Sequence, residues 1–214
     1  MIDRPCAYNS VLLVQACLAD PSSKALRQQA MKLLAEGAGR ILVFFHAEAA
    51  ALGGDEERGW ARLAGSADIS LAVCQAARAR RVASAPEAPF EVSSLVRFWD
   101  AVLRSQWLHA PQRCAVGSGG FVIRLAHQVA EPEAREYLEL VLAGASLELD
   151  LVVLFESDGL GLLAEERARP WGQLVDHGLA RLVTDSANPL SPLLEPVDTA
   201  TIEFWRATRN WIEP

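Results

Sequence analysis

Short apolar runs alternate along this chain with longer stretches in which apolar residues recur at helical spacing. Val11–Ala16, Ile41–Phe45 and Ile69–Val73 are nearly continuous apolar runs. Runs of this kind are typical of strands that are buried on both faces of a parallel sheet. We therefore predict three buried strands in the first half of the chain, and a short last strand over Arg113–Val116.

The segments between these strands carry helix signals. Asp20 offers an N-cap, Pro21 suits the first helical position, and Gly37 can end the helix that follows. Further helices are predicted over Glu56–Ala64 and Ser94–Gln106. Strands that alternate with helices in this way indicate an α/β fold, a mainly parallel sheet with helices on both faces, arranged as in flavodoxin-like proteins.

The second half of the chain repeats the pattern of the first. The matches, in chain order, are VLLVQACLADP (Val11 to Pro21) with VIRLAHQVAEP (Val122 to Pro132), LVFFHAEAAAL (Leu42 to Leu52) with VVLFESDGLGL (Val152 to Leu162), WARL (Trp60 to Leu63) with WGQL (Trp171 to Leu174), and SSLVRFWDAV (Ser93 to Val102) with TATIEFWRAT (Thr199 to Thr208). The order is the same in both halves and the offset is nearly constant. We therefore predict two tandem modules, residues 1–117 and 118–214, joined by a short flexible stretch at Gly117–Gly120.

Composition narrows the functional classes. The chain has 214 residues, 51% of them hydrophobic, and a net charge of −7, which argues against direct binding to nucleic acid. Cysteine occurs at positions 6, 17, 74 and 114 without a CxxC pair, so we expect reduced thiols, no metal and no organic cofactor. No run is long enough for a membrane span, and the apolar run before Cys17 is too short for a lipoprotein leader. We expect a cytoplasmic protein.

Cys74 has the surroundings of a reactive thiol. It ends the predicted strand in LAVCQAARARRV (Leu71 to Val82), and Arg78, Arg80 and Arg81 follow it. Unpaired amides at a strand-to-helix junction and nearby arginines both favour a thiolate. The alternative is a cysteine that fills the core, with the arginines on a solvated helix face.

Three further residues are candidates for the same edge of the sheet. If the first and third strands are neighbours, the strand order reverses between Cys17 and Cys74, and Cys17 is then a possible second thiol. Its alternative role is core packing. His46 and Glu48 follow the second strand and either line the thiol pocket, with a possible part in proton transfer, or are polar loop residues.

The first module resembles the DsrE/TusD family of small sulfur-relay proteins. The resemblance is carried by the opening strand, by VFFHAEAA (Val43 to Ala50), and above all by DISLAVCQAARARRV (Asp68 to Val82). It implies that Cys74 accepts persulfide sulfur. The second module is similar to the companion DsrF/TusC family through VVLFESDGLGLL (Val152 to Leu163), so the chain resembles a fusion of two DsrEFH-like modules.

The resemblance implies a cytoplasmic sulfurtransferase that passes sulfur from Cys74 to an acceptor thiol, in tRNA 2-thiouridine synthesis or in dissimilatory sulfur oxidation. The implied partners are a persulfidated donor protein, the acceptor protein, and a second copy of the chain or a small DsrH/TusB-like subunit, with no membrane. The second module has Thr184 or Asp185 in place of the thiol and Gln128 opposite Cys17, which suggests a partner or scaffold. A non-catalytic assembly or binding protein, or a small-ligand binder, is the alternative for the whole chain.

Overall fold

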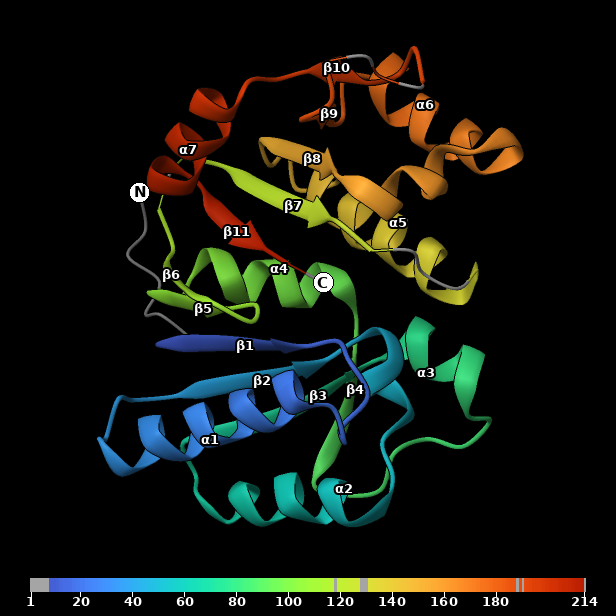
Figure 1. Ribbon diagram of the computed structural model, residues 1–214. Helices are drawn as coiled ribbons and strands as arrows, with labels where there is room; N and C mark the ends of the chain where they lie inside the picture. Colours follow the sequence, from blue (N-terminus) through green and yellow to red (C-terminus); the bar gives the residue numbers. More distant parts are fainter. Residues whose placement is uncertain (1–7, 118, 128–130, 188, 190, 214) are drawn as a thin grey trace. The chain divides into compact units, whose positions relative to one another are not determined.

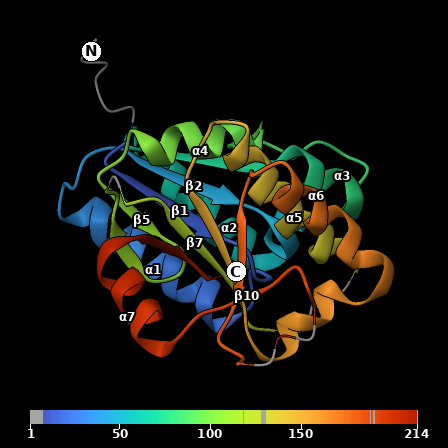
Figure 2. The same ribbon diagram turned by 90° about the horizontal axis from the view of Figure 1, so that it is seen from above.

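The computed structural model describes residues 8–117, 119–127, 131–187, 189 and 191–213. The chain divides into two compact units, Met1–Val116 (unit 1) and Gly117–Pro214 (unit 2). Unit 1 is the part coloured from blue to green and unit 2 the part coloured from yellow-green to red in Figures 1 and 2. Strands alternate with helices in both units, so the predicted α/β class is confirmed.

Unit 1 is built on a six-stranded sheet with the order β4-β3-β2-β1-β5-β6. All neighbouring strands are parallel except β5 and β6, which are antiparallel. The elements are β1 (Ser10–Val14), α1 (Pro21–Ala35), β2 (Ile41–Phe45), η1 (Ala47–Ala51), α2 (Gly54–Ala61), η2 (Arg62–Gly65), β3 (Ile69–Cys74), α3 (Gln75–Arg81), β4 (Phe90–Ser93), α4 (Leu95–Leu103), β5 (Trp107–His109) and β6 (Arg113–Ala115), where η marks a 3-10 helix.

The first helix begins where the sequence predicts. The Asp20 side chain accepts hydrogen bonds from the backbone nitrogen of Ser22 at 2.8 Å and from its hydroxyl at 2.6 Å, and Pro21 opens α1. These bonds satisfy a backbone donor that would otherwise have no partner in the first turn. Gly37 then takes a positive φ of 63° just beyond the end of the helix.

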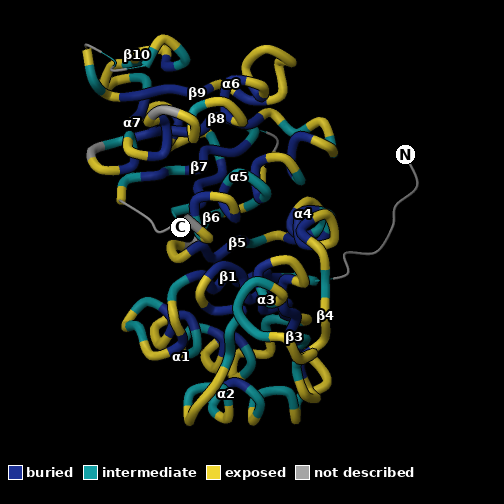
Figure 3. The backbone as a smooth tube through the Cα atoms, turned by 90° about the vertical axis from the view of Figure 1, so that its right-hand side faces the viewer, coloured by how far each residue is buried: buried dark blue, intermediate teal, exposed yellow. Residues whose placement is uncertain are grey.

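Helices cover both faces of the unit 1 sheet. The ring of Phe44 lies 5.0 Å from that of Phe98 in α4, whereas the ring of Phe45 lies 5.3 Å from that of Trp60 in α2. Successive residues of a strand point to opposite faces, so α4 and α2 lie on opposite sides of the sheet. Both faces of β1 and β2 are therefore buried, as the dark blue colour of β1 in Figure 3 illustrates.

Unit 2 repeats this arrangement on a five-stranded sheet with the order β10-β9-β8-β7-β11, in which all neighbours are parallel. When β7 is matched with β1, β8 with β2, β9 with β3, β10 with β4 and β11 with β5, the strand order of unit 2 is the same as that of the first five strands of unit 1. The elements are β7 (Phe121–Leu125), α5 (Glu131–Ala145), β8 (Leu151–Phe155), η3 (Ser157–Leu163), η4 (Glu165–Arg167), α6 (Ala168–Asp176), β9 (Arg181–Thr184), β10 (Glu195–Pro196), α7 (Thr199–Thr208) and β11 (Asn210–Ile212).

The core contacts are repeated as well. Phe155 at the end of β8 and Trp171 of α6 pack edge to face at 5.2 Å and 86°, as Phe45 and Trp60 do at 5.3 Å and 88°. On the other face of the sheet, Ile202 and Trp205 of α7 pack against strand residues of β7, β8 and β9. Helices thus flank both faces of this sheet too, and the internal repeat read from the sequence extends to its tertiary contacts.

The expected strand order is wrong. β2 lies between β1 and β3, so the first and third strands are not neighbours as they are in the flavodoxin order 2-1-3-4-5. The reason is that three successive crossovers step in the same direction, and only the connection through α4 returns to the other side of β1. The strand order therefore reverses between β1 and β5.

The boundaries of the last elements also differ from the prediction. The predicted helix Ser94–Gln106 ends at Leu103, which leaves room for the parallel strand β5. The predicted last strand is present as β6, but it pairs antiparallel with β5 at the edge of the sheet. The short strands β4 and β10 have too few apolar residues to be recognised from their sequence.

The glycine stretch between the modules is held in place at its described residues, where the sequence suggested a flexible joint. The Asn210 side chain donates hydrogen bonds to the carbonyls of Gly117 at 3.1 Å and Gly120 at 2.9 Å. A Cβ atom on Gly119 would lie 2.0 Å from the carbonyl oxygen of Thr208. Glycine is required here because the backbone passes close to the end of α7.

Candidate functional site

The register of unit 1 forms one row of side chains at the carboxyl edge of the sheet. Phe45 of β2 pairs with Val14 of β1 on one side and with Val73 of β3 on the other. The next residues along these strands lie at the same level, and the pairing of β3 with β4 extends the row. From β1 to β4 the row consists of Gln15, His46, Cys74 and Ser93.

Cys74 occupies the position that the sequence predicts for it. It is the last residue of β3 and the N-cap residue of α3, and α3 carries all three candidate arginines. Its side chain is only 1% exposed. The thiol therefore lies at the carboxyl edge of the sheet but beneath the surface.

His46 is a buried residue that directly follows β2, the strand next to that of Cys74. Its ring is fully buried, Nδ1 lies 3.4 Å from Nε2 of Gln15, and Nε2 has no hydrogen-bond partner among the described residues. Burial and, to a smaller extent, the charges of Arg81 and Arg80 together lower the pKa of His46 from 6.5 to about 3. His46 is therefore neutral at physiological pH. Glu48 differs, since it is an exposed residue of η1.

Arg78 connects α3 to the segment that follows His46. Its Nη1 donates to the carbonyl oxygens of Ala50 at 3.1 Å and Ala51 at 2.7 Å, and its Nε donates to that of Ser84 at 3.0 Å. Arg78 thereby fixes η1 against α3, while Arg80 and Arg81 contribute positive charge at His46. The three arginines thus have two different roles.

The backbone of the segment that Arg78 fixes is strained at both ends. Ala47 and Leu52 have positive φ values of 49° and 54°, which residues with a side chain rarely adopt. The segment between them, η1, packs against α3 and β3. Strain of this kind persists only where surrounding contacts impose it, and the bonds from Arg78 are such contacts.

Cys17 does not lie on a strand next to that of Cys74. It is an exposed residue beyond the end of β1, and β2 separates β1 from β3, so the argument that brought the two thiols together is wrong. The reversal of strand order instead involves β1 and β5, and the buried polar residues Gln15 and His109 lie at the carboxyl ends of these two strands. Sequence reasoning missed both. Gln15 could have been found from the sequence, because it is a polar residue that comes directly after the apolar run Val11–Val14.

Unit 2 has different chemistry at the corresponding edge. Phe155 pairs with Thr184, so the residue after Thr184 is the counterpart of Cys74, and it is Asp185. The counterpart of His46 is Glu156, whose carboxylate accepts a hydrogen bond from Arg124 at 2.7 Å. This bond, more than the charges of Glu156 and Glu213, raises the pKa of Arg124. The edge holds an ion pair in place of a thiol, and Gln128 lies outside the described residues.

Comparison of the chain with protein-family models, curated proteins and solved structures found no match. None of the helices that the structure describes is both long enough and apolar enough to cross a membrane. Within the described ranges, no group of three or more His, Cys, Asp or Glu residues is arranged to hold a metal ion.

Proposed function

We propose that the protein is a sulfurtransferase that carries a persulfide on Cys74 and passes it to an acceptor thiol. The observation that supports this most directly is the row at the carboxyl edge of unit 1. In this row Cys74 lies one strand away from His46, which is buried and neutral. Cys74 is also followed directly by α3, a helix with three arginines. Unit 2 has the same topology, but its row has Asp185 at this position, and it acts as partner or scaffold.

The transfer is an exchange at sulfur that needs no external oxidant or reductant. The Cys74 thiolate attacks the outer sulfur of the donor's persulfide; a new S–S bond forms on Cys74, and the donor's S–S bond breaks. The donor cysteine leaves as a thiolate. An acceptor thiolate then attacks the outer sulfur on Cys74 in the same way, which regenerates the Cys74 thiolate.

The neighbouring side chains have separate tasks in this scheme. An amide nitrogen can only donate, so in the orientation shown the Gln15 amide donates to Nδ1 of His46 and the ring proton is on Nε2. In this proposal the Nε2–H group of neutral His46, which has no hydrogen-bond partner among the described residues, turns to the sulfur anion on the neighbouring strand and stabilises it without releasing a proton to it. Arg80 and Arg81 add positive potential, which favours the anionic forms of both the thiol and the persulfide.

Because Cys74 is 1% exposed, a partner can reach its thiol only after a local movement. We assign this movement to η1, which packs against α3 and β3 and is held by Arg78. The partners in this proposal are a persulfidated donor protein and an acceptor protein in the cytoplasm. The pathway is tRNA 2-thiouridine synthesis or dissimilatory sulfur oxidation. Docking of a partner beside η1 would displace this segment and uncover the thiol.

Peptide mass spectrometry tests the proposal directly. The reduced protein is incubated with a persulfidated cysteine desulfurase, and we expect one additional sulfur atom on the peptide that contains Cys74. Cys74→Ser should abolish the addition, and Cys17→Ser, which removes an exposed thiol, should leave it unchanged. Sulfur found only on Cys17, or on no peptide of a folded sample, would contradict the proposal.

A variant of Arg78 tests the access step. Arg78→Gln removes hydrogen bonds to the carbonyls of Ala50, Ala51 and Ser84, and we expect Cys74 to react with iodoacetamide about ten-fold faster, because a charged hydrogen bond contributes about 1.5–3 kcal/mol. Arg97→Gln, at an exposed position of α4, is the matched control. Equal rates in the two variants would show that Arg78 does not control access.

The burial of Cys74 favours a second candidate, a non-catalytic assembly or binding protein. Buried cysteines are ordinarily unreactive and serve as small apolar side chains. Under this alternative, Cys74 accepts no sulfur even when Arg78→Gln has exposed it to iodoacetamide. The two experiments together therefore separate the candidates.

A further inference from the structure

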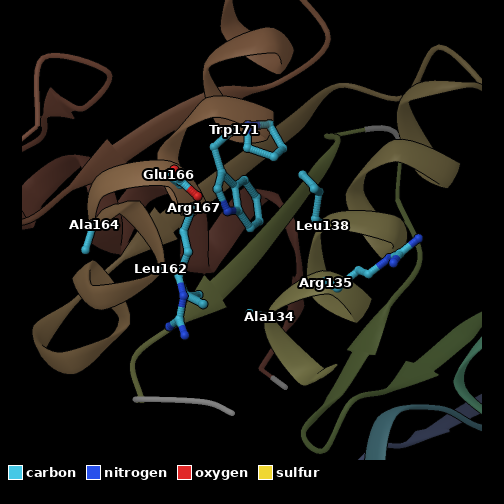
Figure 4. Close-up of a pocket in the computed structure, with 9 residues that line it drawn as sticks. Ala134, Arg135, Leu138, Leu162, Ala164, Glu166, Arg167 and Trp171 are labelled. Carbon is cyan, nitrogen blue, oxygen red and sulfur yellow. The ribbon is translucent and has the colours of Figure 1, made fainter. Parts of the chain in front are cut away.

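The helices of unit 2 enclose a pocket of about 890 Å³ between α5 and the segment from η3 to α6. Arg135 and Arg167 line this pocket, and Figure 4 shows that their side chains point away from each other. The corresponding pair of helices in unit 1 is bridged by the bond between Glu56 of α2 and Arg27 of α1. The two arginines of unit 2 do not converge on one position, so this pocket offers a charged ligand no common anchor.

A second pocket, of about 420 Å³, lies at the amino edge of the sheet of unit 2. Aliphatic side chains from three segments line it: Leu149 before β8, Val175 and Leu179 at the end of α6 and just beyond it, and Leu193 before β10. Val175 and Leu179 are 39% and 37% exposed. Solvent therefore reaches the apolar side chains that form this pocket.

The corresponding place in unit 1 is more polar. The strand pairings align the two units without a gap over this region. In the alignment smaller or polar residues replace the aliphatic ones, with Gly39 in the place of Leu149, Ala64 in that of Val175 and Asp68 in that of Leu179. The side chain of Asn9 fills the space beside Gly39, where a Cβ atom would lie 2.3 Å from its Oδ1. The apolar side chains of the pocket are thus a feature of unit 2 that unit 1 does not share.

Unit 2 differs from unit 1 in a second way, because α7 turns its phenylalanine outward. Val96 and Phe98 of α4 correspond to Ile202 and Phe204 of α7. Unit 1 buries Phe98 completely and leaves Val96 44% exposed, whereas unit 2 buries Ile202 and leaves Phe204 64% exposed. Removal of an aromatic ring from water is favourable, so the ring of Phe204 is suited to a contact with another protein surface.

Arg181 connects the pocket with α7. It lines the pocket, and its guanidinium carbon lies 5.8 Å from the ring centre of Trp205, the residue after Phe204. Its Nε and Nη2 donate hydrogen bonds to Glu195, so Nη1 provides two further N–H donors. Glu203, the residue before Phe204, is an exposed carboxylate. Unit 2 therefore has a pocket beside a guanidinium and a ring beside a carboxylate.

We propose that this surface binds a second copy of the chain, with Phe204 of each copy in the pocket of the other. Such a contact is isologous, which means that it is the same on both sides of a two-fold axis and closes at two subunits. Glu203 of one copy would meet Arg181 of the other, so the charges beside the ring are complementary. Aromatic side chains that fill a pocket are the usual anchors of protein contacts. The proposal does not depend on the chemistry of Cys74.

Analytical ultracentrifugation of two variants and of their mixture tests the proposal. Phe204→Ala removes the ring and Leu179→Glu blocks the pocket, and each should raise the dissociation constant of the dimer at least about ten-fold. An equimolar mixture should associate more tightly than either variant alone, because Phe204 of the Leu179→Glu copy still fits the pocket of the Phe204→Ala copy. Leu142→Glu, which changes a residue that is 42% exposed in α5, and Cys74→Ser should dimerise like the wild type.

Three results would overturn the proposal. The first is a monomeric wild type at micromolar concentration, and the second is growth beyond the dimer, which a contact between unlike surfaces would give. The third is a mixture that associates no more tightly than its two components, which would show that the ring and the pocket do not meet. Leu179 and Phe204 are exposed, so both variants should keep the far-UV circular dichroism of the wild type. If Leu179→Glu does not fold, Val175→Glu blocks the same pocket.

Discussion

At the residue scale, the most unusual group is a histidine that is buried without charge. His46 lies at the end of a fully buried strand, and only one of its ring nitrogens has a hydrogen-bond partner among the described residues. The cost of burying a second polar atom without a partner is about 1–3 kcal/mol. An apolar residue at this position would avoid that cost, so the burial of His46 is compatible with the role proposed for it next to the strand of Cys74.

This burial predicts a specific dependence of stability on pH. The pKa of His46 is about 3 in the folded protein and 6.5 when the chain is unfolded, so between these values the unfolded state binds the additional proton. The stability that neutral His46 contributes is complete above pH 6.5 and is lost as the pH falls. Between pH 7 and pH 5 we expect a loss of about 2 kcal/mol in the free energy of unfolding, measured with urea.

Two histidine variants make this measurement decisive. His46→Gln should remove most of the difference in the free energy of unfolding between pH 7 and pH 5, whatever its effect on that free energy at pH 7. His177→Gln removes an exposed histidine from unit 2 and should keep the difference seen in the wild type. If His46→Gln keeps it as well, the pH dependence belongs to other groups.

Sequence reasoning found Cys74 and His46 but missed Gln15, and it did not find how the three are arranged. Cys74 was placed at a strand end because an apolar run stops there, and this local signal was sufficient. His46 and Gln15 share a row with Cys74 only because β2 lies between β1 and β3. Strand order depends on crossovers over the whole unit, which no local pattern of residues encodes, so the same information wrongly placed Cys17 beside Cys74.

At the scale of elements, the two units share a mode of packing that the sequence repeat anticipated. In each unit the last residue of the second strand is a phenylalanine that packs edge to face against the tryptophan of the next long helix. The tryptophans are 1% and 2% exposed. The two units thus share this core contact but differ in the ion pairs on the nearby helix surfaces.

The two tryptophans should therefore be equally important for stability. We expect Trp60→Ala and Trp171→Ala each to lower the free energy of unfolding of the affected unit by about 3–5 kcal/mol, the usual cost of removing a buried aromatic side chain. Urea unfolding followed by circular dichroism measures this. Met31→Ala, which truncates a side chain that is 52% exposed, should cost less than about 0.5 kcal/mol. A large difference between the tryptophan variants would show that the cores of the two units are not equivalent.

At the scale of the whole molecule, the two units combine one topology with different surface chemistry. The carboxyl edge of unit 1 has the thiol row, and that of unit 2 has an ion pair between Arg124 and Glu156. The helix pair of unit 1 is bridged by Glu56, and that of unit 2 encloses a pocket. The two units therefore share one topology but differ in charge and polarity at both of these places.

The same comparison bears on assembly. The helices α4 and α7 are counterparts in the repeat, yet Phe98 is fully buried in α4, whereas Phe204 is 64% exposed in α7. Large exposed aromatic residues are enriched at subunit contacts. This exposed ring leads us to expect a homodimer with twice the 23.2 kDa mass of one chain.

Light scattering after size exclusion, at micromolar concentration, tests the expected dimer. Phe204→Glu places a charge where the dimer would bury an aromatic ring, and should shift the mass from dimer toward monomer by at least about ten-fold in dissociation constant, since such anchors contribute about 2 kcal/mol or more. Met31→Glu, an equally charged change at an exposed apolar position of α1, should leave the mass unchanged. A monomeric wild type would show that the exposed ring of Phe204 does not mediate self-association, and would leave contact with a different protein as its remaining use.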